Sequence, residues 1–280
     1  MKIKALTLLV ALIFISGCDL FQDDKSYPPV QEGLVSLDGG THTYMLHLPD
    51  GFRDEKNYMN LYPLVIGLHG STTSTSSYYV KNEVRNAYPC VYFAPNNTNI
   101  GFGGSNAAWI REVVHSIIEN KNYKIDRNRI YIIGFSMGGM GTTYMAQDLF
   151  TDYEYLTAAI VPAEGGMFDY IKSNKVRDHI SCWFHIGSAS SYYDQEADYK
   201  SAKKYYPGTL EIVKTGTFTY SIWNGTVSYD ITSYTLKQIK TEIFKSTTYA
   251  GMGHTDEPVF KNPEVIEWLF NQNTADRDLY

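Results

Sequence analysis

The segment of residues 134–138 reads Gly-Phe-Ser-Met-Gly and directly follows the apolar run of residues 130–133. A G-x-S-x-G pattern between a strand and a helix is typical of a nucleophilic serine, because the sharp turn exposes the hydroxyl at the carboxyl edge of a sheet. The backbone N–H of Met137 would point, with the positive end of the following helix, into the space in front of Ser136 Oγ. The pattern therefore predicts acyl transfer with Ser136 as the nucleophile.

A serine hydroxyl needs a base that removes its proton, and the chain contains seven histidines. His254 lies in a glycine-bearing segment that follows the last expected strand and precedes the final expected helix. It comes 118 residues after Ser136 (254 − 136). We predict His254 as the base and interpret His69 as structural. The other histidines are interpreted as ordinary surface or packing residues: His42, His47, His115, His179 and His185.

Strand-like and helical segments alternate along the chain and predict the elements that position these residues. Several strand-like segments are unbroken apolar runs, which is typical of parallel strands that are covered on both faces. The expected strands cover residues 31–37, 41–48, 62–69, 90–95, 129–135, 157–163, 181–186 and 242–250. The expected helices cover residues 105–120, 137–150, 194–206 and 263–272. The alternation predicts an α/β sandwich with a mostly parallel central sheet.

Residues 215–235 do not fit this alternation of strands and helices. Their polarity alternates with period two around Asn224-Gly225, which is a strong signal for a β-hairpin with a type I′ turn. We therefore predict an inserted β-hairpin near 215–235, either as a flap over the site or as a decorated edge of the sheet. Its aromatic residues Tyr220, Trp223 and Tyr229 could contribute to a glycan-binding surface.

The first residues of the chain have the pattern of an export signal. Lys2 and Lys4 precede the apolar residues 5–15, a stretch too short to cross a bilayer as a stable helix. The following residues, Ile15 to Cys18, resemble the bacterial lipobox, in which the cysteine becomes lipidated. A plain secretory signal is the alternative interpretation.

These features predict the organisation of the chain and its location. We expect a lipoprotein signal peptide and lipobox over 1–18, a polar, proline-ended tether over 19–29, and one α/β domain over 30–280. Lipidation of Cys18 would place the protein in the bacterial cell envelope, with its periplasmic or surface orientation open. The membrane is then a partner through the lipid anchor.

Composition narrows the classes of partner and cofactor. The formal net charge is −6 without a cluster of basic residues, which argues against nucleic acid as a partner. No metal-ligand spacing and no dinucleotide-binding glycine pattern occurs, so no cofactor or metal is expected. Cys90 and Cys182 open two expected strands that are not neighbours, so we predict buried thiols rather than a disulfide. The oligomeric state is not predicted.

Several blocks of the sequence together resemble the α/β-hydrolase esterases related to feruloyl esterases, polyhydroxybutyrate depolymerases and the so-called predicted peptidases. The blocks are residues 62–70, 125–142, 251–254 and 262–272. The resemblance implies Ser136 as nucleophile and His254 as base. It also implies an oxyanion hole made by the amide of Met137 and by the amide of Ser71, which ends a His-Gly-Ser turn after an apolar strand.

The acid of the triad departs from the pattern of these esterases. They place an aspartate after the seventh strand, in a segment similar to H-G-x-x-D. Residues 185–194 read HIGSASSYYD, which puts Ser190 at the acid's position and Asp194 four residues further on. Asp194 either reaches back to His254 or caps the following helix. Glu164, after the preceding strand, is the alternative acid, because some α/β hydrolases place it there.

The leading functional hypothesis is a secreted, lipid-anchored serine carboxylic-ester hydrolase that works through an acyl-enzyme. The resemblance and the predicted export favour carbohydrate-linked esters, feruloyl or acetyl, on a small-molecule or polysaccharide substrate. One alternative is a serine peptidase of the same fold. The other is a non-catalytic surface glycan-binding lipoprotein with a decayed triad, which Ser190 and the aromatic residues of the hairpin motivate.

Overall fold

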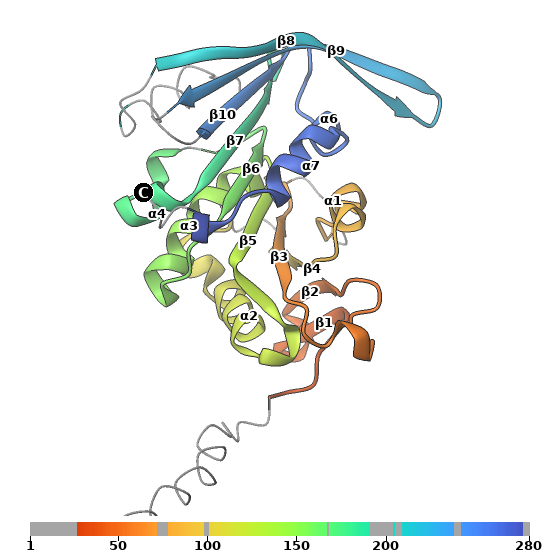
Figure 1. Cartoon of the computed structure of the whole chain (residues 1–280), viewed down its shortest axis with the longest axis vertical. Helices are drawn as coiled ribbons and strands as arrows, with labels where there is room; N and C mark the ends of the chain where they lie inside the picture. The colour runs from red at the N-terminus through yellow and green to blue at the C-terminus, as the bar shows by residue number, and fades with distance from the viewer. Residues whose placement is uncertain are drawn as a thin grey trace, which may run out of the picture.

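The structure is a computed structural model that describes residues 27–71, 78–97, 101–166, 168–190, 204, 209–237 and 242–276. In these residues, ten strands form one sheet in the order β1-β2-β4-β3-β5-β6-β7-β10-β9-β8 (Figure 1). The strands are β1 (Gly33–Leu37), β2 (His42–His47), β3 (Tyr62–Leu68), β4 (Val91–Asn96), β5 (Ile125–Phe135), β6 (Ala159–Ala163), β7 (Ser181–Gly187), β8 (Thr209–Ile222), β9 (Gly225–Lys237) and β10 (Glu242–Tyr249). The α-helices are α1 (Asn82–Ala87), α2 (Ala108–Glu119), α3 (Met137–Tyr153), α4 (Asn174–His179), α6 (Glu257–Phe260) and α7 (Pro263–Phe270).

Six parallel strands form the centre of the sheet, in the order β4-β3-β5-β6-β7-β10. Antiparallel strands extend it on both sides, with β2 and β1 beyond β4, and β9 and β8 beyond β10. Every residue of β3, β6 and β7 is buried, which agrees with their unbroken apolar sequences. The predicted α/β sandwich with a mostly parallel sheet is therefore confirmed.

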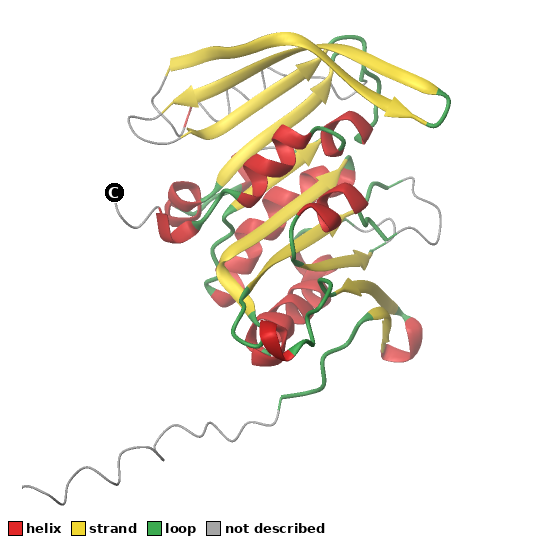
Figure 2. Cartoon of the chain, turned by 45° about the vertical axis from the view of Figure 1, so that its right-hand side comes forward, coloured by secondary structure: helices red, strands yellow, loops and turns green. Residues whose placement is uncertain are grey.

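Helices cover both faces of the parallel strands (Figure 2). Apolar side chains of α2, α3 and α4 enter the core on one face, and those of α1, α6 and α7 enter the core on the other. The period of two along β3 divides its side chains between the cores: Leu64 and Ile66 join the first, and Val65 joins the second. The sheet is thereby fixed from both sides, which gives the turns at its edges a rigid base.

The β8–β9 hairpin extends the edge of the sheet. Pairing between β9 and β10 ends at Ile231↔Tyr249, while pairing between β8 and β9 continues to Ile222↔Gly225. Residues 217–230, called the arm below, therefore project beyond the carboxyl end of β10 (Figure 1). The predicted inserted hairpin near 215–235 is confirmed, with strands longer than expected.

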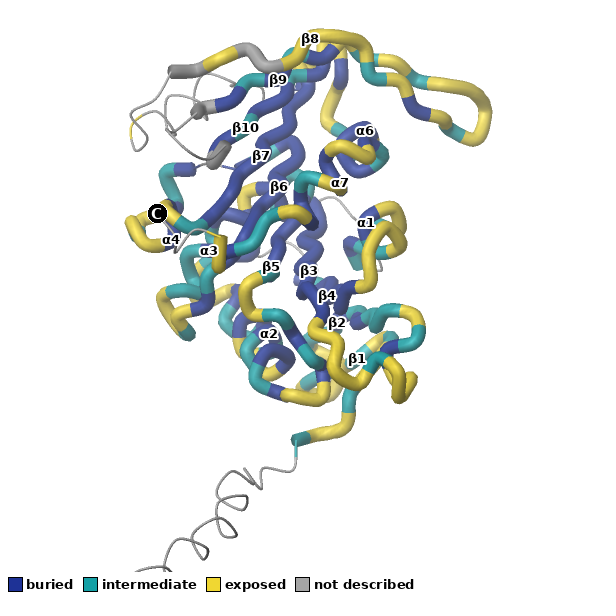
Figure 3. Tube along the Cα trace, in the orientation of Figure 1, coloured by how far each residue is buried: buried dark blue, intermediate teal, exposed yellow. Residues whose placement is uncertain are grey.

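The turn of this hairpin differs from the prediction by one residue. Its two central residues are Trp223 and Asn224, and Gly225 already begins β9. Neither central residue has a positive φ, so the turn is not the type I′ turn that Asn224-Gly225 suggested. The arm is more exposed than the parallel strands beside it (Figure 3).

Both predicted buried thiols lie inside the protein. Cys90 precedes β4 and Cys182 lies in β7, and β3, β5 and β6 separate these two strands. Burial raises the pKa of the Cys90 thiol to about 12, which keeps it protonated. The predicted signal segment with Cys18, most of the tether and most of the helix expected over 194–206 lie outside the described residues. Within the described part of the chain, no helix has the length and apolar character needed to span a membrane.

Candidate active site

Ser136 lies in a tight turn between the end of β5 and the start of α3. Its backbone has φ 55° and ψ −115°, a strained conformation for a residue other than glycine. The glycines on either side are required by close contacts. A Cβ at Gly134 would overlap the carbonyl of Gly138, and a Cβ at Gly138 would overlap the carbonyl of Leu68. The G-x-S-x-G pattern thus forms the strand–turn–helix geometry that exposes a serine hydroxyl.

His254 lies beside this hydroxyl, in the loop between β10 and α6. Its Nε2 is 2.9 Å from Ser136 Oγ, within hydrogen-bond range. The imidazole also packs at 4.8 Å, centroid to centroid, on the ring of Phe135. About 30% of the His254 side chain is exposed, so the ring contacts the serine at a surface that a substrate can reach.

Glu164 provides the carboxylate nearest to the other nitrogen of this ring among the described residues. Its Oε2 is 3.3 Å from His254 Nδ1, and its side chain is fully buried. The residue directly follows β6 and has a positive φ of 56°. Its backbone N–H donates to the carbonyl of His185 at 2.9 Å. Gly187 donates its N–H to Glu164 Oε1 at 2.5 Å, so both ends of the residue are fixed to β7.

The environment of Glu164 affects its ionisation in two opposing ways. Burial raises the pKa of the carboxyl above its ordinary value and is the largest influence. Hydrogen bonds from Ser190, the Gly187 amide and His254 lower that pKa and so favour the carboxylate. The ionised form of Glu164 therefore depends on these donors.

The structure brings together Ser136, His254 and the alternative acid Glu164. Asp194, the first choice for the acid, lies outside the described residues. Ser190, which the sequence pattern put at the expected position of the acid, places its Oγ 3.5 Å from His254 Nδ1. The roles of these residues stay predictions, but the order hydroxyl, imidazole, carboxylate is that of a catalytic triad.

The turn after β3 lies against the serine turn and carries the second expected oxyanion donor. The ring of His69 is buried, donates from Nδ1 to the Gly70 carbonyl at 2.9 Å, and accepts the Asn97 N–H at Nε2 at 2.9 Å. The peptide bond between Gly70 and Ser71 is trans. The bond to the Gly70 carbonyl therefore also fixes the direction of the Ser71 N–H, on the opposite side of that peptide.

The amide of Met137 is the other expected oxyanion donor. Met137 is the first residue of α3, and the first N–H groups of a helix have no acceptor within the helix. The positive end of the helix macrodipole lies at the same place. Ser71 and Met137 therefore belong to adjoining turns beside Ser136, and their predicted role fits this placement.

A cluster that the sequence did not indicate holds the His254 loop. Asp256 accepts a hydrogen bond from the Tyr79 hydroxyl and pairs with Lys81 Nζ at 2.5 Å. Lys81 Nζ also lies 4.6 Å from the centre of the Tyr79 ring. The side chains of Lys81 and Asp256 are 22% and 14% exposed. The only sequence signal was an acidic residue two positions after the predicted base.

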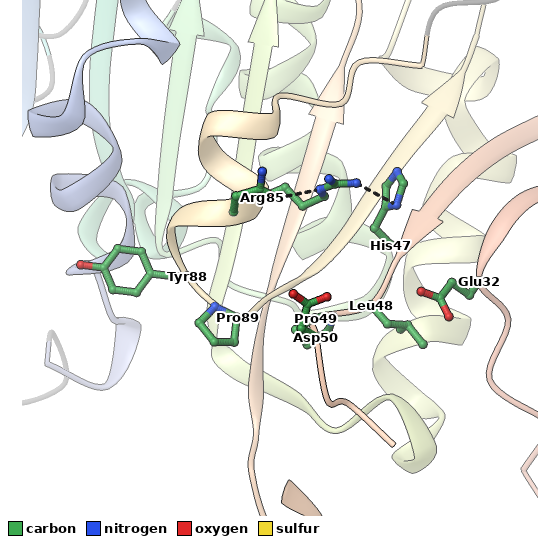
Figure 4. A pocket seen from close by; sticks show the side chains of 9 residues that line it. Glu32, His47, Leu48, Pro49, Asp50, Arg85, Tyr88 and Pro89 are labelled. Atoms are coloured by element: carbon green, nitrogen blue, oxygen red, sulfur yellow. Dashed lines mark hydrogen bonds between the residues drawn. The ribbon is translucent and has the colours of Figure 1, made fainter. Parts of the chain in front are cut away.

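A separate cavity of about 380 Å³ lies at the opposite edge of the sheet, near the amino end of β4 (Figure 4). Glu32, His47, Asp50, Arg85 and Tyr88 are among its lining residues. Arg85 Nη1 lies 3.3 Å from His47 Nδ1, and burial followed by the Arg85 charge lowers the pKa of His47. The cavity mixes acidic and basic groups and is separate from the Ser136 site.

The fold and the arrangement around Ser136 are those of an α/β hydrolase. Over residues 66–270 the chain matches the family described as "Alpha/beta hydrolase of unknown function (DUF915)", and it belongs to this family. The predicted resemblance to α/β hydrolases is thereby confirmed. Among curated proteins, none matches the chain.

Solved esterases share the fold. A thermostable esterase matches with a TM-score of 0.58 and 20% identity, covering 87% of this chain and 63% of that one. A ferulic acid esterase matches with a TM-score of 0.54 and 13% identity, covering 85% and 96%. An acetyl xylan esterase from Aspergillus awamori matches with a TM-score of 0.53 and 14% identity, covering 86% and 99%. This chain thus spans less than two thirds of the thermostable esterase, and identities this low establish the fold alone.

Proposed function

We propose that the protein is a serine carboxylic-ester hydrolase with Ser136 as nucleophile, His254 as base and Glu164 as the acid of the triad. The observation that carries the proposal is the position of the His254 ring. One nitrogen lies 2.9 Å from the Ser136 hydroxyl and the other lies 3.3 Å from the Glu164 carboxylate. A neutral imidazole can take the hydroxyl proton at Nε2 while its Nδ1–H donates to the carboxylate.

In the first half of the reaction, Ser136 Oγ attacks the ester carbonyl carbon while its proton moves to His254 Nε2. The carbonyl oxygen becomes an oxyanion, and the N–H groups of Ser71 and Met137 stabilise it. The Glu164 carboxylate stabilises the imidazolium that forms. Collapse of the tetrahedral intermediate expels the alcohol, which takes the proton from His254, and leaves an ester between Ser136 and the acyl group.

In the second half, water takes the place of the alcohol, and the steps of the first half occur in reverse order. His254 Nε2 takes a proton from water as its oxygen attacks the acyl carbon. The second tetrahedral intermediate then releases the carboxylic acid, and His254 returns the proton to Ser136 Oγ. The site thus regenerates itself without any group beyond its own residues and water.

For the substrate class we propose carbohydrate-linked feruloyl or acetyl esters. Support comes from solved proteins of this fold that are described as a ferulic acid esterase and an acetyl xylan esterase. The predicted export of the chain agrees with a polymer substrate outside the cell. Rates on methyl ferulate, acetylated xylan and a peptide p-nitroanilide would separate this class from a peptidase. Faster turnover of the peptide would contradict the ester assignment.

The proposed location is the bacterial cell envelope, with a lipid attached at Cys18. The support is the pattern of residues 1–18 in the sequence. Cells that express the chain and are labelled with radioactive palmitate should yield a labelled, membrane-bound protein. Cys18→Ala should lose the label, whereas Cys90→Ala, which removes a buried thiol of the domain, should keep it. Equal labelling of the wild type and Cys18→Ala would contradict the lipid anchor.

The hydrolase proposal is tested with p-nitrophenyl acetate, comparing the purified chain with Ser136→Ala. We expect the variant to lose nearly all enzyme-dependent hydrolysis, because no other group supplies the nucleophile. Equal rates for both proteins would favour the glycan-binding alternative. The exposure of the hairpin's three aromatic residues gives this alternative less support. Tyr220 is buried, Tyr229 is half-buried, and only Trp223 is fully exposed.

A further inference from the structure

Ser190 contacts two members of the proposed triad at once. Its Oγ lies 3.5 Å from His254 Nδ1, and its hydroxyl donates to the Glu164 carboxylate. The residue is 7% exposed. His254 Nδ1 therefore faces two oxygen atoms, one from a carboxylate and one from a hydroxyl that is bonded to that carboxylate.

The turn that carries Ser190 is held firmly between β7 and the loop of His254. Ser190 N–H donates to the Gly187 carbonyl at 3.0 Å, and the neighbouring Ala189 N–H donates to the Met252 carbonyl at 3.0 Å. Gly187 also donates its N–H to Glu164. One short segment thus connects the hydroxyl of Ser190, the carboxylate of Glu164 and the loop that carries His254.

We propose that Ser190 is a positioning residue of this site, whose hydroxyl binds the Glu164 carboxylate and holds it against Nδ1 of His254. The inference rests on the proposed function and deepens it. Glu164 reaches the imidazole from the end of β6, and its carboxylate needs donors inside the protein because it is removed from water. Gly187 N–H supplies one donor, at Oε1. The Ser190 hydroxyl supplies a second donor, and its Oγ lies 3.5 Å from His254 Nδ1.

The pH dependence of the reaction should change when the Ser190 hydroxyl is removed. Loss of the Ser190 hydroxyl removes an interaction that favours the ionised carboxyl, so the Glu164 carboxyl binds a proton more readily. Two titratable side chains of the adjoining strands, His185 and Tyr249, stay uncharged in this pH range, whereas Lys245 on β10 lies over the Trp183 ring, 3.9 Å from its centre. Burial lowers the pKa of His185, on β7, to about 3 and raises the pKa of Tyr249, on β10, well above its ordinary value. The readout is therefore the acidic limb, which is the fall of kcat/KM toward low pH.

The experiment compares the wild type with Ser190→Ala, with p-nitrophenyl acetate as substrate between about pH 5 and pH 9. We expect kcat to fall by about 10-fold with little change in KM, the size expected for one hydrogen bond to a charged group. The acidic limb of kcat/KM should move to higher pH by about half to one unit. A role in folding alone would lower the amount of active enzyme without moving the limb.

Ser181→Ala is the matched control. Ser181 begins β7, is buried, and donates to the Gln272 side chain at 2.7 Å. Ser181→Ala therefore removes a comparable buried hydroxyl at the opposite edge of the sheet. It should change stability without moving the acidic limb. An unchanged kcat and an unmoved limb in Ser190→Ala would overturn the inference. If Ser136→Ala were as active as the wild type, the proposed function itself would fail, which is a different outcome.

Discussion

The turn after β3 and the loop after β10 each place a histidine at the carboxyl edge of the sheet, close to the Ser136 turn. The His69 ring is buried and forms hydrogen bonds of 2.9 Å with two backbone groups, the Gly70 carbonyl and the Asn97 N–H. His254 is partly exposed and contacts a hydroxyl at 2.9 Å and a carboxylate at 3.3 Å. The two rings therefore have the same chemistry and different partners.

The partners decide what each ring can do. Burial lowers the pKa of His69, and its two backbone partners match one neutral tautomer, with the proton on Nδ1. These two bonds let the ring hold the peptide after Gly70 in place. His254 has a proton source on one side and an anion on the other, which is the requirement for a general base. The following experiments test this difference, from the largest expected effect to the smallest.

Removing the imidazole at position 254 should have the largest effect. We expect His254→Ala to lower kcat by roughly 10⁴- to 10⁶-fold, the range for loss of a triad base, because the Ser136 hydroxyl then keeps its proton. The measurement is steady-state hydrolysis of p-nitrophenyl acetate, with unfolding followed by circular dichroism as the control. A loss of less than 10-fold in a folded variant would show that another group acts as the base.

Replacing the buried carboxyl should cost almost as much activity without costing stability. Glu164→Gln keeps the shape of the side chain, and its oxygen can still accept the Gly187 N–H. The variant loses the anion that orients and stabilises the His254 ring, so we expect kcat to fall by roughly 10³- to 10⁴-fold. Asp194→Asn is the matched comparison. A large loss in Asp194→Asn and a small loss in Glu164→Gln would transfer the acid role to Asp194.

The stability of Glu164→Gln follows from the direction of the pKa shift. Burial raises the pKa of Glu164 in the folded state, so the folded protein binds this proton more tightly than the unfolded chain does. Ionisation therefore lowers stability as the pH rises from the unfolded pKa through the folded pKa, and the full cost is present above both. At pH 7 the urea midpoint of Glu164→Gln should be equal to or above that of the wild type. This advantage should shrink as the pH falls toward 4.

Changing the structural histidine should give an intermediate effect. His69→Ala removes the bond that fixes the Gly70 carbonyl, so the Ser71 N–H is no longer aimed by that peptide. We expect kcat to fall by about 10- to 100-fold, less than complete loss of an oxyanion donor. The acidic limb of kcat/KM should not move, because His69 carries no proton in the reaction. If the limb did move, or if the loss matched that of His254→Ala, the two histidines would not differ as described.

The sequence was enough to propose Ser136 as nucleophile and His254 as base, because short local patterns at the ends of strands indicate such positions. Ser136 lies in a turn that needs Gly134 and Gly138, and His254 follows the last strand. The position of the acid could not be settled in the same way. Glu164 reaches His254 through a positive φ and through contacts with β7, which are tertiary features. Whether a carboxylate lies near His254 Nδ1 depends on how the segments after β6, β7 and β10 pack together.

The hairpin illustrates the same limit on a smaller scale. Period-two polarity was enough to predict two paired strands, because alternating side chains match the two faces of a half-buried hairpin. The turn was misplaced by one residue, since the cross-strand register sets Ile222 opposite Gly225 and the Asn-Gly signal alone does not fix that register. How far the arm extends past β10 depends on where the pairing of β9 with β10 ends, at Ile231↔Tyr249, which the alternation of polarity within the hairpin does not indicate.

The smallest effect is expected at Asp256, which supports the His254 loop from outside the reacting groups. Asp256→Asn retains an acceptor for the Tyr79 hydroxyl but removes the charge that pairs with Lys81. We expect kcat to fall by about two- to ten-fold and the free energy of unfolding by about 1–2 kcal/mol, because this ion pair is only partly exposed to water.

The control for Asp256→Asn is Glu264→Gln, which removes an exposed ion pair with Lys214 at 2.5 Å and should change stability by less than about 0.5 kcal/mol. Denaturant unfolding and the pH profile of kcat/KM distinguish the two sites. Because Asp256 acts on the position of His254 and not on its proton, its variant should leave the acidic limb in place. If Asp256→Asn moved that limb as far as Ser190→Ala, the loop after β10 would contain a second group that affects the proton on His254.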